Sequence, residues 1–69
     1  MGTKETLERM PKHVVDYLEH LRSDYNMDGF NYAHKAATRN RAAGYTLGLR
    51  DAGLITERER QILFIYTTV

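Results

Sequence analysis

Hydrophobic positions near the N-terminus repeat with the period of a helix. Between residues 4 and 25 they form one stripe, which comprises Leu7, Met10, Val14, Tyr17, Leu18, Leu21 and Tyr25. Spacings of three, four and seven residues are typical of an amphipathic helix that buries one side. Pro11 interrupts the pattern, because proline lacks an N–H and clashes with the carbonyl four residues earlier. We expect the helix to kink or to restart at Pro11, with both parts on the same core.

A second helix is predicted from residue 31 or 32 to residue 52, after a polar turn that begins at Asn26. One of its faces carries mainly small side chains, namely Ala33, Ala36, Ala37, Asn40, Gly44, Leu47 and Gly48. Glycine lowers the stability of an isolated helix. We expect this face to lie against another helix, because small side chains let two helix backbones approach closely.

Signals for a tight helix–turn–helix lie between Gly53 and Thr56. Glycine suits the left-handed position just past a helix, and Leu49 and Leu54 have the spacing of the hydrophobic contact in a Schellman motif. Thr56 and Glu59 match the T-x-x-E pattern of a capping box, which begins a helix. The sequence therefore predicts a helix that ends just before Gly53 and another that begins directly after Thr56.

The third predicted helix, residues 57–67, is apolar on almost its whole circumference, because residues 62–66 are all hydrophobic or aromatic. Its core-facing side chains are expected to be Ile62, Leu63 and Tyr66. The remaining apolar side chains would face outward, and they are Phe64, Ile65 and Val69. Contiguous exposed apolar residues commonly mark an interface, so we expect a homodimer through this helix. The β-branched and aromatic run is also compatible with a strand, which is the structural alternative.

Length and composition bound the class of protein. Sixty-nine residues, 42% of them hydrophobic, predict one all-α domain of three helices over residues 1–69. The chain has no cysteine, which excludes disulfides and thiolate chemistry. No apolar run is long enough to span a membrane, and the N-terminus is too polar for a signal peptide, so we expect a cytoplasmic protein. A formal net charge of +1 does not by itself indicate a nucleic-acid-binding domain.

Basic residues are concentrated in the second predicted helix, where no acidic residue occurs between positions 29 and 50. Three of them align on one side with a tyrosine, and this basic face comprises Tyr32, Lys35, Arg39 and Arg50. Arg41 points to another side of the helix. The basic face could contact an acidic protein surface or follow a phosphate backbone, or it could simply be solvated.

A weak candidate for a metal site precedes the second helix. Asp24, Asn26 and Asp28 stand in the D-x-[DN]-x-[DN]-G order that opens an EF-hand calcium loop. Position twelve of such a loop should be a bidentate glutamate, and here it is Lys35, whose charge repels a cation. We therefore interpret the segment as a polar turn and expect no metal. A degenerate EF-hand-like calcium-binding protein is kept as an alternative.

Catalytic chemistry has little support in the sequence. Ser23 is the only serine, and no nucleophile elbow, glycine-rich phosphate loop or spaced pair of acids accompanies it. Short helical chains also rarely enclose a pocket of the size that small-molecule sites need. We expect no enzyme activity and no cofactor.

Two short stretches resemble known families. Residues 49–59 are similar to the short C-terminal helical hairpin, which carries a leucine followed by D-A-G-L-I-T-x-x-E, and the resemblance implies an oligomerisation or docking element. Residues 55–63 resemble the start of LuxR-type DNA-binding domains, L-T-x-R-E-x-x-[VI]-L. The scanning and recognition helices of that family do not follow within the 69 residues, so no DNA-contacting residue carries over.

These observations predict a non-catalytic, helical interaction protein that binds a protein partner with an acidic surface. It would act as a regulator, adaptor or inhibitor, for example from a phage or another mobile element, and as a homodimer. The alternative is a nucleic-acid-binding accessory protein that uses the basic face. The two differ in salt dependence, because contacts to phosphates release counterions.

Overall fold

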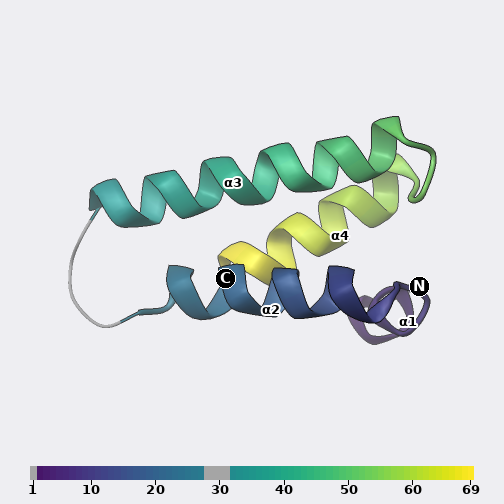
Figure 1. The fold of residues 1–69 in the computed structure, drawn as a ribbon, viewed down its shortest axis with the longest axis horizontal. Helices are drawn as coiled ribbons and strands as arrows, with labels where there is room; N and C mark the ends of the chain where they lie inside the picture. Colours follow the sequence, from purple (N-terminus) through teal and green to yellow (C-terminus); the bar gives the residue numbers. More distant parts are fainter. Residues whose placement is uncertain (1, 28–31) are drawn as a thin grey trace.

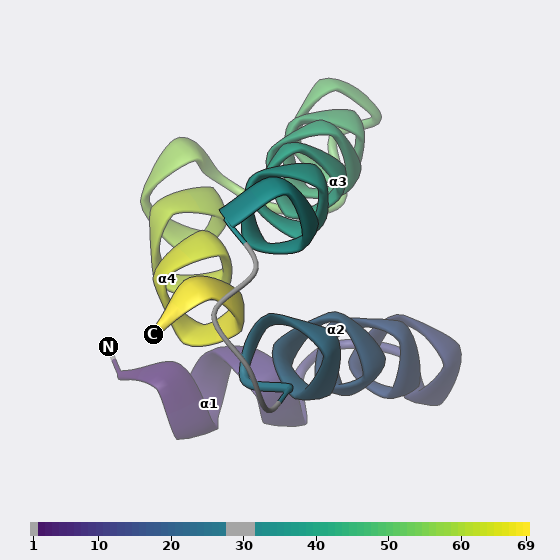
Figure 2. The same ribbon diagram turned by 90° about the vertical axis from the view of Figure 1, so that its left-hand side faces the viewer.

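The chain folds into four helices without strands among the residues that the structure, a computed structural model, describes: 2–27 and 32–69. The helices are α1 (Thr3–Glu8), α2 (Lys12–Tyr25), α3 (Tyr32–Asp51) and α4 (Glu57–Thr68). In Figure 1, α2 and α3 lie roughly antiparallel and α4 runs obliquely between them. Viewed end-on, α4 lies beside both α3 and α1 (Figure 2), and it contacts all three other helices. The all-α prediction is confirmed, and the strand alternative is wrong because residues 62–66 lie inside α4.

Pro11 divides the first predicted helix into two. α1 ends at Glu8, and Pro11 adopts φ −57° and ψ 151°, which is an extended conformation. Its carbonyl accepts hydrogen bonds from the N–H groups of Val14 and Val15, at 3.0 and 3.1 Å, so Pro11 is the N-cap residue of α2. The restart at Pro11 is therefore confirmed, and it explains why the fold has four helices where the hydrophobic pattern predicts three.

The core forms where α2, α4 and the end of α3 meet. Its buried hydrophobic cluster consists of Val14, Leu18, Leu49, Ile55 and Leu63, with Leu7, Met10 and Tyr45 packed against it. Four threonines are also fully buried, which a polar-versus-apolar pattern does not predict: Thr6, Thr38, Thr46 and Thr67. The hydroxyls of Thr6, Thr46 and Thr67 donate to the carbonyl four residues earlier, at 2.8–2.9 Å. This bond satisfies the hydroxyl, so the methyl group can be buried in the core.

α3 faces the core with a different side from the one predicted. Its buried residues are Thr38, Ala42, Thr46 and Leu49. Every member of the predicted contact face is exposed to solvent, and we call this set the small-residue face: Ala33, Ala36, Ala37, Asn40, Gly44, Leu47 and Gly48. The prediction is wrong because that face offers little apolar area. Leu49, Tyr45 and the threonine methyl groups, on the opposite side, bury more.

The junction between α3 and α4 follows the local signals closely. Gly53 has φ +78°, the Leu54 N–H donates to the Leu49 carbonyl at 3.0 Å, and the Gly53 N–H donates to the Arg50 carbonyl at 2.9 Å. These are the two hydrogen bonds of a Schellman motif. The expected hydrophobic contact is weak, because Leu54 stays 63% exposed while the next residue, Ile55, enters the core.

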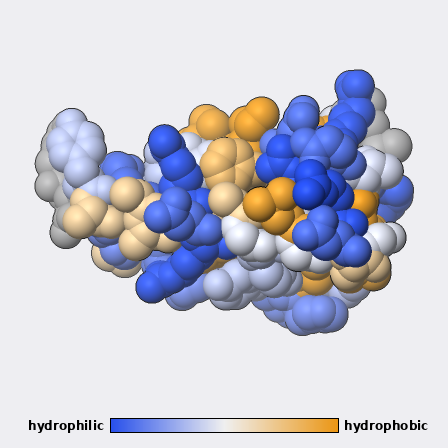
Figure 3. All heavy atoms as spheres, turned by 90° about the horizontal axis from the view of Figure 1, so that it is seen from above, coloured by the Kyte–Doolittle hydropathy of each residue, from blue (hydrophilic) through white to orange (hydrophobic). Residues whose placement is uncertain are grey.

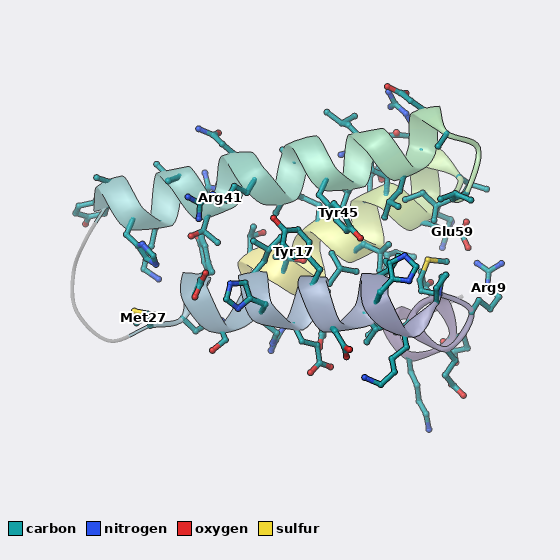
Figure 4. The ribbon with its side chains drawn as sticks, viewed as in Figure 1. Arg9, Tyr17, Met27, Arg41, Tyr45 and Glu59 are labelled. Carbon is teal, nitrogen blue, oxygen red and sulfur yellow. The ribbon has the colours of Figure 1, made fainter. Side chains whose placement is uncertain are left out.

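Glu59 is a buried carboxylate that links the first turn of α4 to the residue that follows α1. Its Oε1 accepts a hydrogen bond from the Thr56 N–H at 2.8 Å, and its own N–H donates to the Thr56 hydroxyl at 3.1 Å, so the predicted capping box is confirmed. Its Oε2 forms an ion pair with Arg9, which directly follows α1 (Figure 4). The residue is 6% exposed. The start of α4 is therefore bound both to its own cap and to the N-terminal helix.

Candidate macromolecular interface

An open cleft of about 300 Å³ lies where α2 ends and α3 begins. We call it the tyrosine cleft, and it is lined by Tyr25, Tyr32, Lys35, Ala36 and Arg39. Two aromatic rings and two cationic side chains therefore line one small volume, and the lining residues that the structure describes include no carboxylate. The three residues from α3 that carry this chemistry belong to the predicted basic face, and α2 supplies Tyr25.

Tyr25 holds both cations of the cleft in place. The Lys35 ammonium donates to the Tyr25 carbonyl at 2.5 Å and lies 4.3 Å from the centre of the Tyr25 ring. The Arg39 guanidinium donates to the Tyr25 hydroxyl, with 3.3 Å between Nη2 and Oη. A lysine at the C-terminal end of a helix also interacts favourably with the last carbonyls and with the helix dipole. The end of α2 thus orders two positive charges on the neighbouring helix.

Arg50 does not join the other members of the predicted basic face. Its guanidinium donates to the Glu57 carboxylate at 2.6 Å and to the Asp51 carboxylate at 3.2 Å. The hydrogen bond to Glu57, followed in size by the one to Asp51, raises the pKa of Arg50. Hydrogen bonds from Arg60, Arg50 and Gln61 hold the pKa of Glu57 well below its usual range. Arg50 is therefore ion-paired with the start of α4 and is not among the described residues that line the cleft, and its place in a shared partner-binding face stays a prediction.

Lys35 and Arg39 differ in their ion pairing from five of the other basic groups of the chain. Within residues 2–27 and 32–69, carboxylates pair with Arg9, Lys12, His20, Arg50 and Arg60, and none is found within 4.0 Å of the charged nitrogens of Lys35 or Arg39. Arg41 is also exposed, but it lies on the side of α3 that carries Tyr45, away from the cleft (Figure 4). Among the described residues, the cleft thus holds two adjacent positive charges without a carboxylate within ion-pairing distance.

The small-residue face forms the outer surface of the bundle. Figure 3 looks down on α3 and shows hydrophobic colours at its N-terminal end and near its middle, with strongly hydrophilic side chains between them. Gly44 and Gly48 lie on this surface with ordinary helical backbone, since Gly53 is the only described residue with positive φ. A Cβ added at either glycine would meet nothing within 4 Å. The fold itself therefore does not require glycine at these two positions.

The predicted oligomer interface on α4 is exposed in part. Ile65 is 59% and Val69 70% exposed, whereas Phe64 is half-buried. Of the predicted core-facing residues, Leu63 is fully buried, and Tyr66 is half-buried with its ring 4.6 Å from the Arg22 guanidinium. Of the three residues of the predicted interface, Ile65 and Val69 present open apolar surface for a second copy, and the interface stays a prediction.

The candidate calcium ligands make protein contacts. Asp24 pairs with His20 at 3.3 Å, and the Asn26 amide donates to the Arg22 carbonyl at 2.9 Å. Asp28 lies outside the described residues. No group of three or more His, Asp or Glu side chains able to hold a metal ion is found within residues 2–27 and 32–69. Lys35, in the position of the bidentate glutamate, is bound to the end of α2.

None of the helices, over the part of the chain that the structure describes, is long and apolar enough to cross a bilayer. No family model matches the chain, and neither the curated proteins nor the solved structures yield a match.

Proposed function

We propose that this chain is a non-catalytic interaction protein that binds an acidic protein partner along α3. In this proposal it acts in the cytoplasm as a regulator, adaptor or inhibitor of that partner. The observation that carries the proposal is the small-residue face, a helix surface with two glycines for which the fold gives no internal reason. The tyrosine cleft, at the start of the same helix, supplies the charge.

The two glycines weaken α3 without a benefit inside the chain. Glycine in a helix interior costs about 1 kcal/mol relative to alanine. Gly44 and Gly48 have helical backbone and open space around the missing Cβ, so alanine would fit both positions. A partner helix that packs closely on this surface would explain the glycines, because a Cβ would then hold its backbone away. Residues that lower stability in this way are common where a protein binds.

Charge favours a different chain over a second copy on this surface. α3 carries no acidic residue before Asp51, and no described carboxylate pairs with Lys35 or Arg39 at its start. Two α3 helices packed on each other would bring the positive charges of both copies together. An acidic partner gains a favourable interaction and is also steered towards the surface.

A nucleic-acid accessory role is the second candidate function. It is favoured by Tyr32, which is 75% exposed beside two cations, because single-stranded nucleic acids bind through stacked rings and basic side chains. Salt dependence separates the two candidate functions. The affinity for a nucleic-acid strand falls steeply between about 50 and 200 mM salt, whereas the affinity of a protein interface with apolar contacts falls far less.

The glycines provide the test of the proposed function. We expect Gly44→Met combined with Gly48→Met to raise the free energy of unfolding by about 1 kcal/mol, because methionine is the better helix former. The same variant should lose the partner that a tagged wild-type chain captures from its source cell. Gln61→Met, which places the same side chain on the exposed side of α4, is the control and should retain capture. Unchanged capture by the double variant would contradict the proposal.

Self-association through α4 is proposed as a separate property. We expect sedimentation equilibrium at about 100 μM chain to give twice the 8.0 kDa mass of one chain. Ile65→Asp should shift the protein towards monomer, because it places a charge in the predicted interface. Ile65 is 59% exposed, so this change leaves the core intact. A wild-type monomer would show that no dimer forms and would leave Ile65 and Val69 as surface residues only.

A further inference from the structure

We propose that the tyrosine cleft receives a phosphorylated side chain of the partner protein. The inference rests on the proposed function, which places that partner on α3, and it identifies the group that enters the cleft at the start of this helix. The observation behind it is the placement of Lys35 and Arg39 against Tyr25, beside Tyr32, with no carboxylate among the lining residues of segments 2–27 and 32–69.

The charge of the cleft matches a phosphate monoester better than a carboxylate. Lys35 and Arg39 are four residues apart on one helix, which separates their backbones by about 6 Å along its axis. Lys35 contacts the carbonyl and ring of Tyr25, Arg39 contacts its hydroxyl, and both line the same cleft, so a ligand in the cleft lies beside both positive charges. A phosphorylated side chain carries about −1.5 to −2 charges near neutral pH, and a carboxylate carries only one. Arginine also binds phosphate oxygens through its planar fork, and lysine binds them as a compact charge.

The cations are held in position before a ligand arrives. Tyr25 accepts a hydrogen bond from Lys35 through its carbonyl and one from Arg39 through its hydroxyl. Each contact uses only some of the donors of its side chain, since an ammonium has three N–H groups and a guanidinium five. The remaining donors can bind a ligand. Because the side chains are already ordered, binding loses less conformational entropy than it would with two free surface cations.

The rings and the size of the cleft favour a single side chain with a flat stem. Tyr32 is 75% exposed, so its ring offers a wall for an aromatic or other planar group next to the phosphate. The cleft, at about 300 Å³, is at the lower end of the range for small-molecule sites. It therefore suits one phosphorylated residue, with phosphotyrosine as the best match in shape and charge.

Phenyl phosphate is a minimal probe of this chemistry. We expect its titration into the ¹⁵N-labelled full-length chain to shift the amide resonances of Tyr25, Tyr32, Lys35, Ala36 and Arg39, with few shifts elsewhere. Binding should be about tenfold tighter than for benzoate, which has the same ring and a single charge, and tighter than for inorganic phosphate. Arg39→Gln and Tyr32→Ala change exposed side chains, so both should fold, and each should weaken binding by about tenfold.

Arg41→Gln is the matched control, because it removes the same charge from the same helix outside the cleft, and it should leave the affinity unchanged. The inference is overturned if benzoate binds as well as phenyl phosphate, or if Arg41→Gln weakens binding as much as Arg39→Gln. It is also overturned if a short single-stranded oligonucleotide occupies the cleft far more tightly than a phosphotyrosine peptide, which would favour nucleic acid.

The two proposals can fail separately. Loss of capture in the Gly44→Met/Gly48→Met variant, together with no binding of phenyl phosphate at the cleft, refutes the phosphate inference and leaves the docking of a partner on α3 intact. Normal capture by that variant refutes the docking proposal, whatever the titration shows.

Discussion

Replacement of Leu63 by alanine is expected to lower the free energy of unfolding by about 3 kcal/mol. Leu63 is fully buried in the middle of α4 and belongs to the core cluster with Val14 and Leu18. Large-to-small changes at such sites remove transfer free energy and leave a cavity, which together cost about 2–5 kcal/mol. The whole free energy of unfolding of a domain of 69 residues is only about 3–10 kcal/mol. We therefore expect the variant to be largely unfolded at moderate urea concentration, as measured by circular dichroism.

Ile65→Ala provides the control for this change. Ile65 lies two residues away on the same helix and is 59% exposed in the single chain, so in a sample dilute enough to be monomeric its truncation should change the free energy of unfolding by about 0.5 kcal/mol or less. A loss at Ile65 as large as that at Leu63 would contradict the orientation of α4. It would mean that the side of the helix with Ile65 is the one buried.

Replacement of Glu59 by alanine is expected to cost about 2–3 kcal/mol, an unusually large loss for a charged residue. Two interactions disappear together: the cap on the Thr56 N–H and the buried ion pair with Arg9. Removing a capping group typically costs about 1 kcal/mol, and breaking a buried pair costs more. The Arg9 side chain is 51% exposed, so water can solvate it after the change. The loss of stability therefore stays below the largest values seen when a fully buried ion pair is broken. Thermal and urea unfolding would measure it.

A double-mutant cycle with Arg9→Ala separates the two contributions of Glu59. If the ion pair joins α1 to α4 as described, the two losses should not add, because either change removes the same contact. Glu57→Ala is the control from the same turn of α4, and it should cost much less, since its ion pairs with Arg50 and Arg60 are exposed and screened by water. Additive losses at Arg9 and Glu59 would show that this ion pair contributes nothing to stability.

Much of the local architecture follows from the sequence alone. The restart at Pro11 needs only the geometry of one residue and its neighbours, and the turn at Gly53 and the cap at Thr56 each depend on signals within six residues. The buried side of α2 is also predictable, because large apolar residues recur there at helical spacing. These features involve contacts that are short in sequence, so the amino-acid order specifies them before any helix meets another.

Only the tertiary structure decided which side of α3 is buried and which residues form the candidate site. α3 has small side chains on one side and threonines on the other, so its own sequence pattern favours burial of neither side. The apolar surface that α2 and α4 offer determines which side is buried. Tyr25 has the period of a core residue, yet it lines the cleft with side chains seven to fourteen positions later. Lys35, Arg39 and Arg50 look equivalent on a helical wheel, but Glu57 neutralises only Arg50. Contacts between helices decide each case, because they depend on distances in space that local sequence does not encode.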